Sequence, residues 1–328
     1  MNKFSQKFDI EKIFEEDFAN FNELLWEPLN GDSVFFTLYG RNALFLGLSS
    51  LSEITPKREI LVPSYSCGDE VRTILNAGFT IKPYRVNVDL QNDEIDIVNK
   101  IGENTVAIFI THFLGFPQNG IQKIRQICDE KGIYLIEDCA HCCGGTFHGK
   151  VLGTLGDFSV FSLRKSLNIL HGGALVLNNK NLKEPEMKVA SSELVNMDLF
   201  TYLGYRQGYI TPGSSISHLL KETSESNDPH SARHDKFGGY SIGISNFAKY
   251  TVKKMMPQVD KKRRNLIYSN YLQIVKSISS KKFSALIDTI DNETKPLFFP
   301  ILVDDSETVY KKLVKNNLII APSLVRAT

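Results

Sequence analysis

The feature that most constrains the fold is a regular alternation of apolar runs with amphipathic stretches between residues 59 and 178. The apolar runs are rich in branched and aromatic residues, bounded by turn residues, and predict buried strands. They lie at 59–65, 80–88, 105–113, 132–139, 157–163 and 172–179. Two intervening stretches, 70–79 and 121–132, have helical spacing and carry a glycine near the end, which is typical of a helix C-terminus. Strands alternating with helices predict an α/β fold with a mostly parallel sheet.

The pattern changes after about residue 240. A long helical stretch interrupted at Pro257, a strand at 295–305 and an amphipathic helix at 307–316 predict a smaller α+β domain. Residues 221–236 are polar without periodicity, which is typical of a mobile loop or a connection between domains. We therefore expect a large domain over 1–238, including the N-terminal segment, and a small domain over 239–328.

Composition narrows the class of protein. The chain has 328 residues, of which 42% are hydrophobic, enough to bury a substantial core. Its 38 basic and 37 acidic residues give a formal net charge of +1, so no electrostatic argument favours nucleic acid as a partner. No apolar run approaches the roughly 18–20 residues that span a bilayer, and the N-terminal stretch of mixed charge is not a signal peptide. We expect a cytoplasmic protein whose five cysteines are reduced.

Polar residues at the ends of the predicted strands are the candidates for a site, because ligands gather at the carboxyl ends of parallel strands. They are Ser64, His112, Asp138 and Ser162. Asp138, in IEDCAH, directly follows an apolar strand, and a buried carboxylate is costly unless a cationic partner keeps it ionised. Asp138 therefore indicates that a positive group meets it, although a helix N-cap or a structural ion pair would explain it as well.

Lys165 follows the strand that ends at Ser162 and lies between two apolar segments, ahead of the pair Gly172–Gly173. A lysine in such a pocket can act as an amine nucleophile, and a lysine on a surface hairpin is the alternative. A third group, Gly40, Arg41 and Asn42, precedes a helical pattern. Free N–H groups at a helix start favour an anion such as phosphate.

A lysine, an acid and an anion cradle together match the needs of one cofactor. An aldehyde cofactor with a phosphate group needs a lysine for a Schiff base, an acid to keep its ring nitrogen protonated, and donors for its phosphate. This is the chemistry of pyridoxal phosphate, whose ring acts as an electron sink. Lys165, Asp138 and the residues after Tyr39 would supply the three parts.

The same residues occur in a familiar order. The set YGRNAL, ILVPSYSCGDEV, THFLG, YLIEDCAHCCGGTFHGKVLGTLGDFSVFSLRKSL and HGGALVLNN resembles the sugar-nucleotide aminotransferases of the DegT–StrS family, which are fold-type-I pyridoxal-phosphate enzymes. The resemblance is close over residues 33–180 and looser over 240–320. It implies that Lys165 forms the Schiff base and moves the proton, that Asp138 pairs with the ring nitrogen, and that His141 faces the ring hydroxyl. The implied cofactor-binding set is Gly40, Arg41, Asn42, Asp138, His141, Ser162 and Lys165.

The resemblance also implies partners: glutamate as amino donor, a nucleotide-linked keto-sugar as acceptor, and a second copy of the chain in a homodimer. Surface polysaccharide synthesis is the expected setting. Neither a metal nor a membrane is expected. A sugar dehydratase or another enzyme of the same family is an alternative, although the dehydratases are expected to have replaced the lysine. A non-catalytic, regulatory member of the family is the second alternative.

Four departures from the family pattern bear on these expectations. Cys67 stands where many members carry an aromatic residue over the ring, with Tyr65 or His112 as substitutes. Ser241 stands where an asparagine is often lent across the dimer, and fewer residues separate Ser162 from Lys165. The sequence ends at PSLVRAT, earlier than the family leads us to expect, so the small domain is expected to be shortened.

Overall fold

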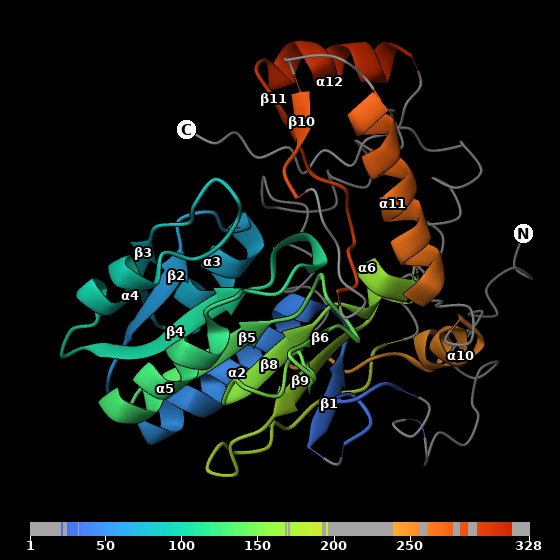
Figure 1. Ribbon diagram of the computed structural model, residues 1–328. Coiled ribbons are helices and arrows are strands. Elements are labelled where there is room, and N and C mark those ends of the chain that lie inside the picture. Colours follow the sequence, from blue (N-terminus) through green and yellow to red (C-terminus); the bar gives the residue numbers. More distant parts are fainter. Residues whose placement is uncertain are drawn as a thin grey trace, which may run out of the picture.

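The computed structural model describes residues 21, 25–31, 33–167, 169, 171–191, 195, 239–255, 261–277, 283–287 and 294–316. Its centre is a seven-stranded sheet with the order β1-β9-β8-β5-β4-β2-β3 (Figure 1). The strands are β1 (Val34–Thr37), β2 (Glu59–Pro63), β3 (Thr80–Tyr84), β4 (Thr105–Thr111), β5 (Tyr134–Asp138), β8 (Phe158–Phe161) and β9 (Gly173–Leu177). Five neighbouring strands, β3, β2, β4, β5 and β8, run parallel to one another. β9 runs antiparallel to β8 on one side and to β1 on the other. The predicted α/β fold with a mostly parallel sheet is confirmed.

Alternation along the strands places a helical layer on each face of the sheet. On β2, Ile60 and Val62 face a core shared with α2 (Gly40–Ile54) and α3 (Gly68–Asn76). Leu61 faces the opposite core, which is shared with α4 (Glu94–Lys100), α5 (Ile121–Lys131) and α10 (Asn246–Met255). The strands are apolar throughout because both faces are covered.

The helices end where the sequence predicts. The chain leaves α5 at Gly132, which has a φ of 62°, and turns after α3 at Gly78, which has a φ of 82°. These left-handed conformations cost glycine little. The strands are shorter than expected at their carboxyl ends, so the polar residues after them stand free of the ladder at one edge of the sheet.

Residues 239–255 pack against the sheet. Gly243 forms an antiparallel bridge with Thr37, and Ile244 donates a backbone hydrogen bond to Phe36. Ala248 and Val252 of α10 are fully buried in the core of that face. The division into domains at 238 stays a prediction. Residues 221–236 and Pro257 lie outside the described residues.

A second group of elements stands above the sheet in Figure 1. It comprises α11 (Lys261–Ser277), β10 (Phe283–Ala285), β11 (Ile301–Val303) and α12 (Ser306–Lys315). The strand expected over 295–305 is wrong in length, because Pro296 and Pro300 lack the N–H that a ladder needs. Tyr268 of α11 packs edge-on against Phe116, with ring centroids 5.5 Å apart, and ties this group to the sheet. Among the described residues, no helix combines the length and apolarity that crossing a bilayer requires.

Candidate active site

Lys165 lies at the carboxyl edge of the sheet, on the short helix α6 (Leu163–Leu167) that follows β8. Its backbone N–H bonds to the carbonyl of Ser162, which holds the turn. The side chain is solvent-exposed, and its Nζ lies 2.8 Å from Nε2 of His141. The structure thus brings together two predicted site residues that are 24 positions apart.

The ring of His141 is oriented by a backbone contact. The N–H of Leu114 donates to Nδ1 at 3.2 Å. Burial, reinforced by the charge of Lys165, lowers the pKa of His141 to about 4, so the ring is neutral at physiological pH. A neutral ring with an accepting Nδ1 carries its hydrogen on Nε2. Nε2 is the ring nitrogen that faces Nζ of Lys165.

Asp138 ends β5 and is 3% exposed. Its Oδ1 accepts a hydrogen bond from the N–H of Ala140 at 2.9 Å, which fixes the carboxylate at the start of the turn that carries His141. The N-cap alternative does not hold, because no helix begins in this turn. The positive partner expected for Asp138 is a ligand group or the nearby ammonium of Lys165.

Glu70 is a site residue that the sequence analysis did not single out. It lies in the first turn of α3, and its Oε2 accepts a hydrogen bond from the N–H of Cys67 at 3.2 Å. Its carboxyl group is hydrogen-bonded to that of Asp138, and burial together with the charge of Asp138 raises its pKa well above the usual range. The signal was present, because an acid three residues after the N-cap and ahead of an apolar run marks a capping box.

The opposite end of the site is the start of α2. A Cβ added at Gly40 would lie 3.3 Å from the carbonyl oxygen of Phe161 and 3.6 Å from Cβ of Ser162. A Cβ added at Gly173 would collide with the backbone of Tyr39 and Gly40. The first turn of α2, Ser162 and Gly173 therefore lie closely packed together, and the role of this group in holding a phosphate stays a prediction.

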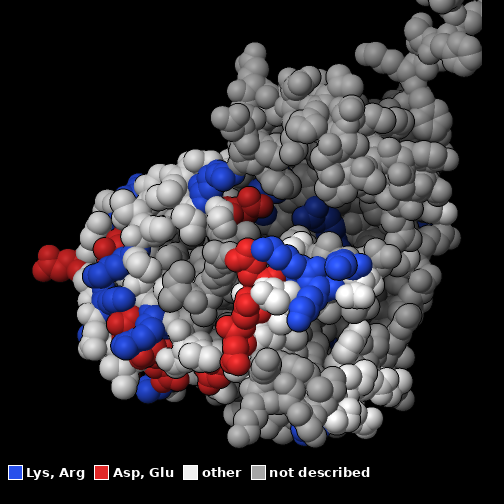
Figure 2. Space-filling view, turned by 90° about the horizontal axis from the view of Figure 1, so that it is seen from above, with Lys and Arg blue, Asp and Glu red and all other residues white. Residues whose placement is uncertain are grey.

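Two predicted cradle residues already have side-chain partners. Nδ2 of Asn42 donates to the carbonyl of Tyr240 at 2.8 Å. The guanidinium of Arg41 pairs with Asp69 at 3.5 Å and lies over the ring of Tyr39, 4.5 Å from its centroid. Burial lowers the pKa of Arg41, although the charge of Asp69 opposes that effect. Arg164, next to Lys165, also stacks on Tyr39, at 5.4 Å. Seen from above the view of Figure 1, the surface carries basic and acidic side chains next to one another (Figure 2).

His112 is wrong as a residue that could cover a cofactor. It is fully buried, and its Nε2 lies 3.2 Å from Oε2 of Glu137. Glu137 also accepts N–H bonds from residues 153, 155 and 156. Burial opposes ionisation of Glu137, but the bonds from His112 and these amides outweigh it and lower its pKa. The pair braces the core, because successive residues of β5 point to opposite faces.

The remaining residues that could cover the ring lie on the segment after β2. Cys67 is exposed, and Tyr65 is partly buried with its ring edge-on to Phe113, 5.3 Å between centroids. All five cysteines are free thiols, as predicted. Within the part of the chain that the structure describes, one group has metal-ligand types close together, His112, Glu137 and Cys139, but the histidine and carboxylate bond to each other and to backbone amides.

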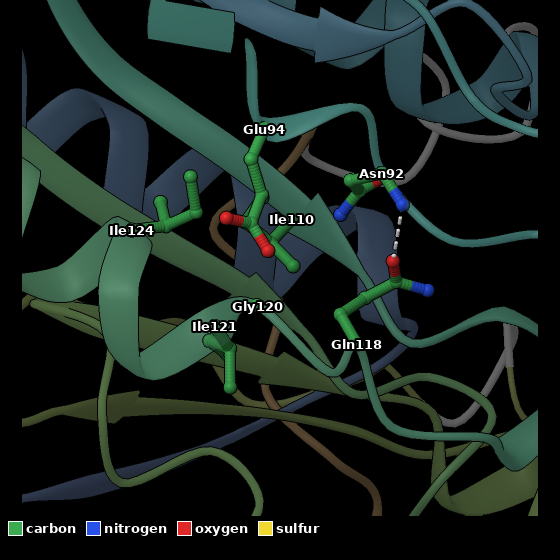
Figure 3. Close-up of a pocket in the computed structure, with 7 residues that line it drawn as sticks. All are labelled: Asn92, Glu94, Ile110, Gln118, Gly120, Ile121 and Ile124. Carbon is green, nitrogen blue, oxygen red and sulfur yellow. Dashed lines mark hydrogen bonds between the residues drawn. The ribbon is translucent and has the colours of Figure 1, made fainter.

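A small hollow between α4 and α5 is separate from this site. Figure 3 shows its polar side chains turned toward one another, with Asn92 donating its N–H to Oε1 of Gln118 at 2.9 Å. The side chain of Glu94 lies against Gly120, and its carboxylate pairs with Lys123. These contacts brace the loops around α5, and none of the predicted site residues lines the hollow.

The arrangement fits pyridoxal phosphate on two observations. The absence of a Cβ at Gly40 and Gly173 lets the backbone of Phe161 and of β9 approach the start of α2, whose first-turn N–H groups are the kind of donors that bind a phosphate. At the other end, the buried Asp138 offers a carboxylate to a protonated nitrogen, with Lys165 and His141 beside it.

Comparison with known proteins agrees with the sequence pattern. The profile of the DegT/DnrJ/EryC1/StrS aminotransferase family matches residues 8–211. A GDP-perosamine synthase of Vibrio cholerae is 28% identical over 278 residues, which is 80% of this chain and 71% of that protein. A GDP-perosamine synthase of Escherichia coli O157:H7 is 24% identical over 307 residues, 90% and 78% of the two chains.

Solved structures share the fold. AtS13 from Actinomadura melliaura superposes with a TM-score of 0.65 at 21% sequence identity, covering 94% of this chain and 77% of that one. At this identity the similarity concerns the fold.

Proposed function

Since the chain belongs to the DegT/DnrJ/EryC1/StrS aminotransferase family, we propose that it moves an amino group from glutamate to a nucleotide-linked keto-sugar, with pyridoxal phosphate as cofactor. The observation that carries the proposal is the meeting of Lys165, His141 and Asp138 at one edge of the sheet, opposite the cradle of α2. Bound there, pyridoxal phosphate supplies the electron sink that the transfer needs.

Each side chain then has a role that its surroundings support. Gly40, Arg41, Asn42 and Ser162 would hold the phosphate through helix N–H groups, charge and hydroxyl. Asp138 would keep the ring nitrogen protonated, because a buried carboxylate stabilises a cation placed against it. His141 would face the ring hydroxyl.

Lys165 would hold the cofactor covalently and, once released, carry the proton between substrate carbon and cofactor. Its exposed position on α6 gives Nζ access from solvent, where substrates arrive. A general base must lie within reach of the proton that it moves, and Nζ of Lys165 lies at the same edge of the sheet as His141 and Asp138.

A nucleotide-linked sugar as acceptor is supported by the relatives, two of which are GDP-perosamine synthases. Biosynthesis of surface polysaccharides is the corresponding setting. A cytoplasmic homodimer with glutamate as donor completes the proposal. The retained Lys165 favours amination over dehydration, since we expect dehydratases of this family to have replaced it.

The experiment separates the two halves of the reaction. Protein loaded with pyridoxal phosphate is mixed with glutamate, and released 2-oxoglutarate is measured with the absorbance of the cofactor. A panel of keto-sugar nucleotides is then added. We expect one equivalent of 2-oxoglutarate per site, followed by amination of one acceptor. Lys165→Ala should lose both steps, whereas Lys150→Ala, on the exposed strand β7 (Lys150–Val151), should retain them. Absence of 2-oxoglutarate from wild type would contradict the proposal.

A further inference from the structure

Two acidic residues in the first turn of α3 contact both ends of the proposed cofactor site. Asp69 pairs with Arg41, on the cradle side, at 3.5 Å. Glu70 is hydrogen-bonded to Asp138, on the ring-nitrogen side. The helix start thus presents one carboxyl group to the residue proposed for the phosphate and one to the residue proposed for the ring.

The contact between Glu70 and Asp138 requires a proton. Two carboxylates cannot hydrogen-bond to each other when both are ionised, so one of them is an acid. Asp138 already accepts from the N–H of Ala140, whereas Glu70 is the group whose pKa is raised well above its usual range, by burial and by Asp138. Glu70 is therefore the donor of the shared proton, and a carboxylate oxygen of Asp138 accepts it.

The position of Glu70 is set by its backbone. Its Oε2 accepts from the N–H of Cys67, which closes the capping box of α3 and directs the carboxyl group toward the sheet edge. The hydrogen bond from Cys67 therefore caps α3 and also orients the carboxyl group of Glu70 toward Asp138.

We propose that Glu70 is a positioning residue that occupies the carboxylate of Asp138 until the cofactor binds, so that the acid of Glu70 and the ring nitrogen compete for one acceptor. This inference rests on the proposed function, because it takes Asp138 as the partner of the ring nitrogen. The consequence is that cofactor affinity depends on the protonation of Glu70.

The groups that face Glu70 determine the sign of that dependence. They are Asp138 of β5, Lys165 of α6 and Tyr84 of β3, with Asp69 adjacent on α3. At low pH the protonated acid holds Asp138, and the cofactor must displace it. As pH rises through the pKa of Glu70, the shared proton is lost, the two carboxylates repel, and the competition ends. The affinity of the wild-type protein for pyridoxal phosphate should therefore increase with pH more than the affinity of a variant that has no titratable group at position 70.

The test measures the dissociation constant of pyridoxal phosphate for the full chain freed of cofactor, by absorbance titration between pH 6 and 9. Glu70→Ala removes the competitor and should bind about tenfold or more tightly than wild type at pH 6, the effect of losing one charge-assisted hydrogen bond. The ratio should shrink toward one as pH rises. Glu70→Gln keeps an acceptor for the N–H of Cys67 and a donor for Asp138. This variant should therefore bind pyridoxal phosphate more weakly than Glu70→Ala at every pH.

Glu103→Gln, at an exposed position away from the site, is the matched control and should follow wild type. Equal or weaker binding by Glu70→Ala, or a pH profile of Glu70→Gln that matches wild type, would overturn the inference while leaving the proposed function in place. Failure of wild type to bind pyridoxal phosphate at any pH would contradict both. Thermal unfolding of each variant shows whether the fold is retained, and Glu70→Gln, which preserves the helix cap, decides the result if Glu70→Ala does not fold.

Discussion

Nζ of Lys165 lies 2.8 Å from Nε2 of His141, and Nδ1 of the same ring accepts the N–H of Leu114 at 3.2 Å. The ring is thus held from one side by the backbone after β4 and presented to the lysine on the other. This relationship joins three separate segments of the chain at the carboxyl edge of the sheet. Because the ring is buried in this arrangement, its lowered pKa should affect how the stability of the protein depends on pH.

Protein stability should fall as pH falls from about 6.5 to about 4 because of His141. Burial lowers its pKa in the folded state to about 4, whereas an unfolded chain takes up the proton near pH 6.5. The unfolded state therefore binds more protons in this window, and the accumulated loss is at most about 3 kcal/mol. His141→Gln removes the titration.

Urea unfolding of both proteins at pH 7 and pH 5 checks this prediction. The loss between the two pH values should be smaller for His141→Gln than for wild type. His148→Asn, at an exposed position, should behave as wild type. An identical loss in wild type and His141→Gln would show that His141 is not held neutral in the folded protein.

Gly173→Ala should weaken cofactor binding. The added Cβ would meet the backbone of Tyr39 and Gly40, so the start of α2 must move. A displaced helix start no longer presents its N–H groups to the phosphate. Equilibrium titration with pyridoxal phosphate is the measurement. Gly102→Ala is the control, because its Cβ would be 3.9 Å from the nearest atom, an ordinary contact. Unchanged affinity in Gly173→Ala would place the phosphate elsewhere.

Glu137→Gln should destabilise the fold by about 1–3 kcal/mol, the usual cost of leaving a buried hydrogen-bonding group without its partner. The amide would turn an N–H₂ group toward donors, since Glu137 accepts from three backbone amides and faces His112. Because the pKa of Glu137 is lowered in the folded state, its stabilisation is complete above the unfolded value of about 4.3 and is lost as pH falls through the folded pKa.

Chemical denaturation of Glu137→Gln beside Glu53→Gln provides the comparison. Glu53 is exposed and pairs with Lys183 at 3.5 Å, so its substitution should cost less than about 1 kcal/mol. Similar losses in the two variants would show that the buried cluster does not carry the stability assigned to it.

Much of the sheet followed from sequence because its strands are buried on both faces and therefore continuously apolar. The same argument placed Asp138 and Lys165 at one edge, since parallel strands end there together. It failed for the run at 295–305, where apolarity favoured a strand but two prolines shorten the ladder. Apolarity records burial, whereas strand length depends on which backbone groups can pair.

The neighbours of the site residues were harder to predict. His112 and Asp138 both follow strand ends, yet His112 turns into the core to meet Glu137. Sequence position gives the end of a strand but not the face on which the last side chain lies. Glu70 was missed for another reason, because its role depends on a capping contact that directs an ordinary helix-start acid across the site.

The most direct test of the account is reduction of the pyridoxal-phosphate-loaded protein with borohydride, followed by peptide mapping. We predict one stable label per chain, on Lys165, and its loss in Lys165→Ala. A label on another lysine of the wild-type protein, or no label at all, would contradict the account.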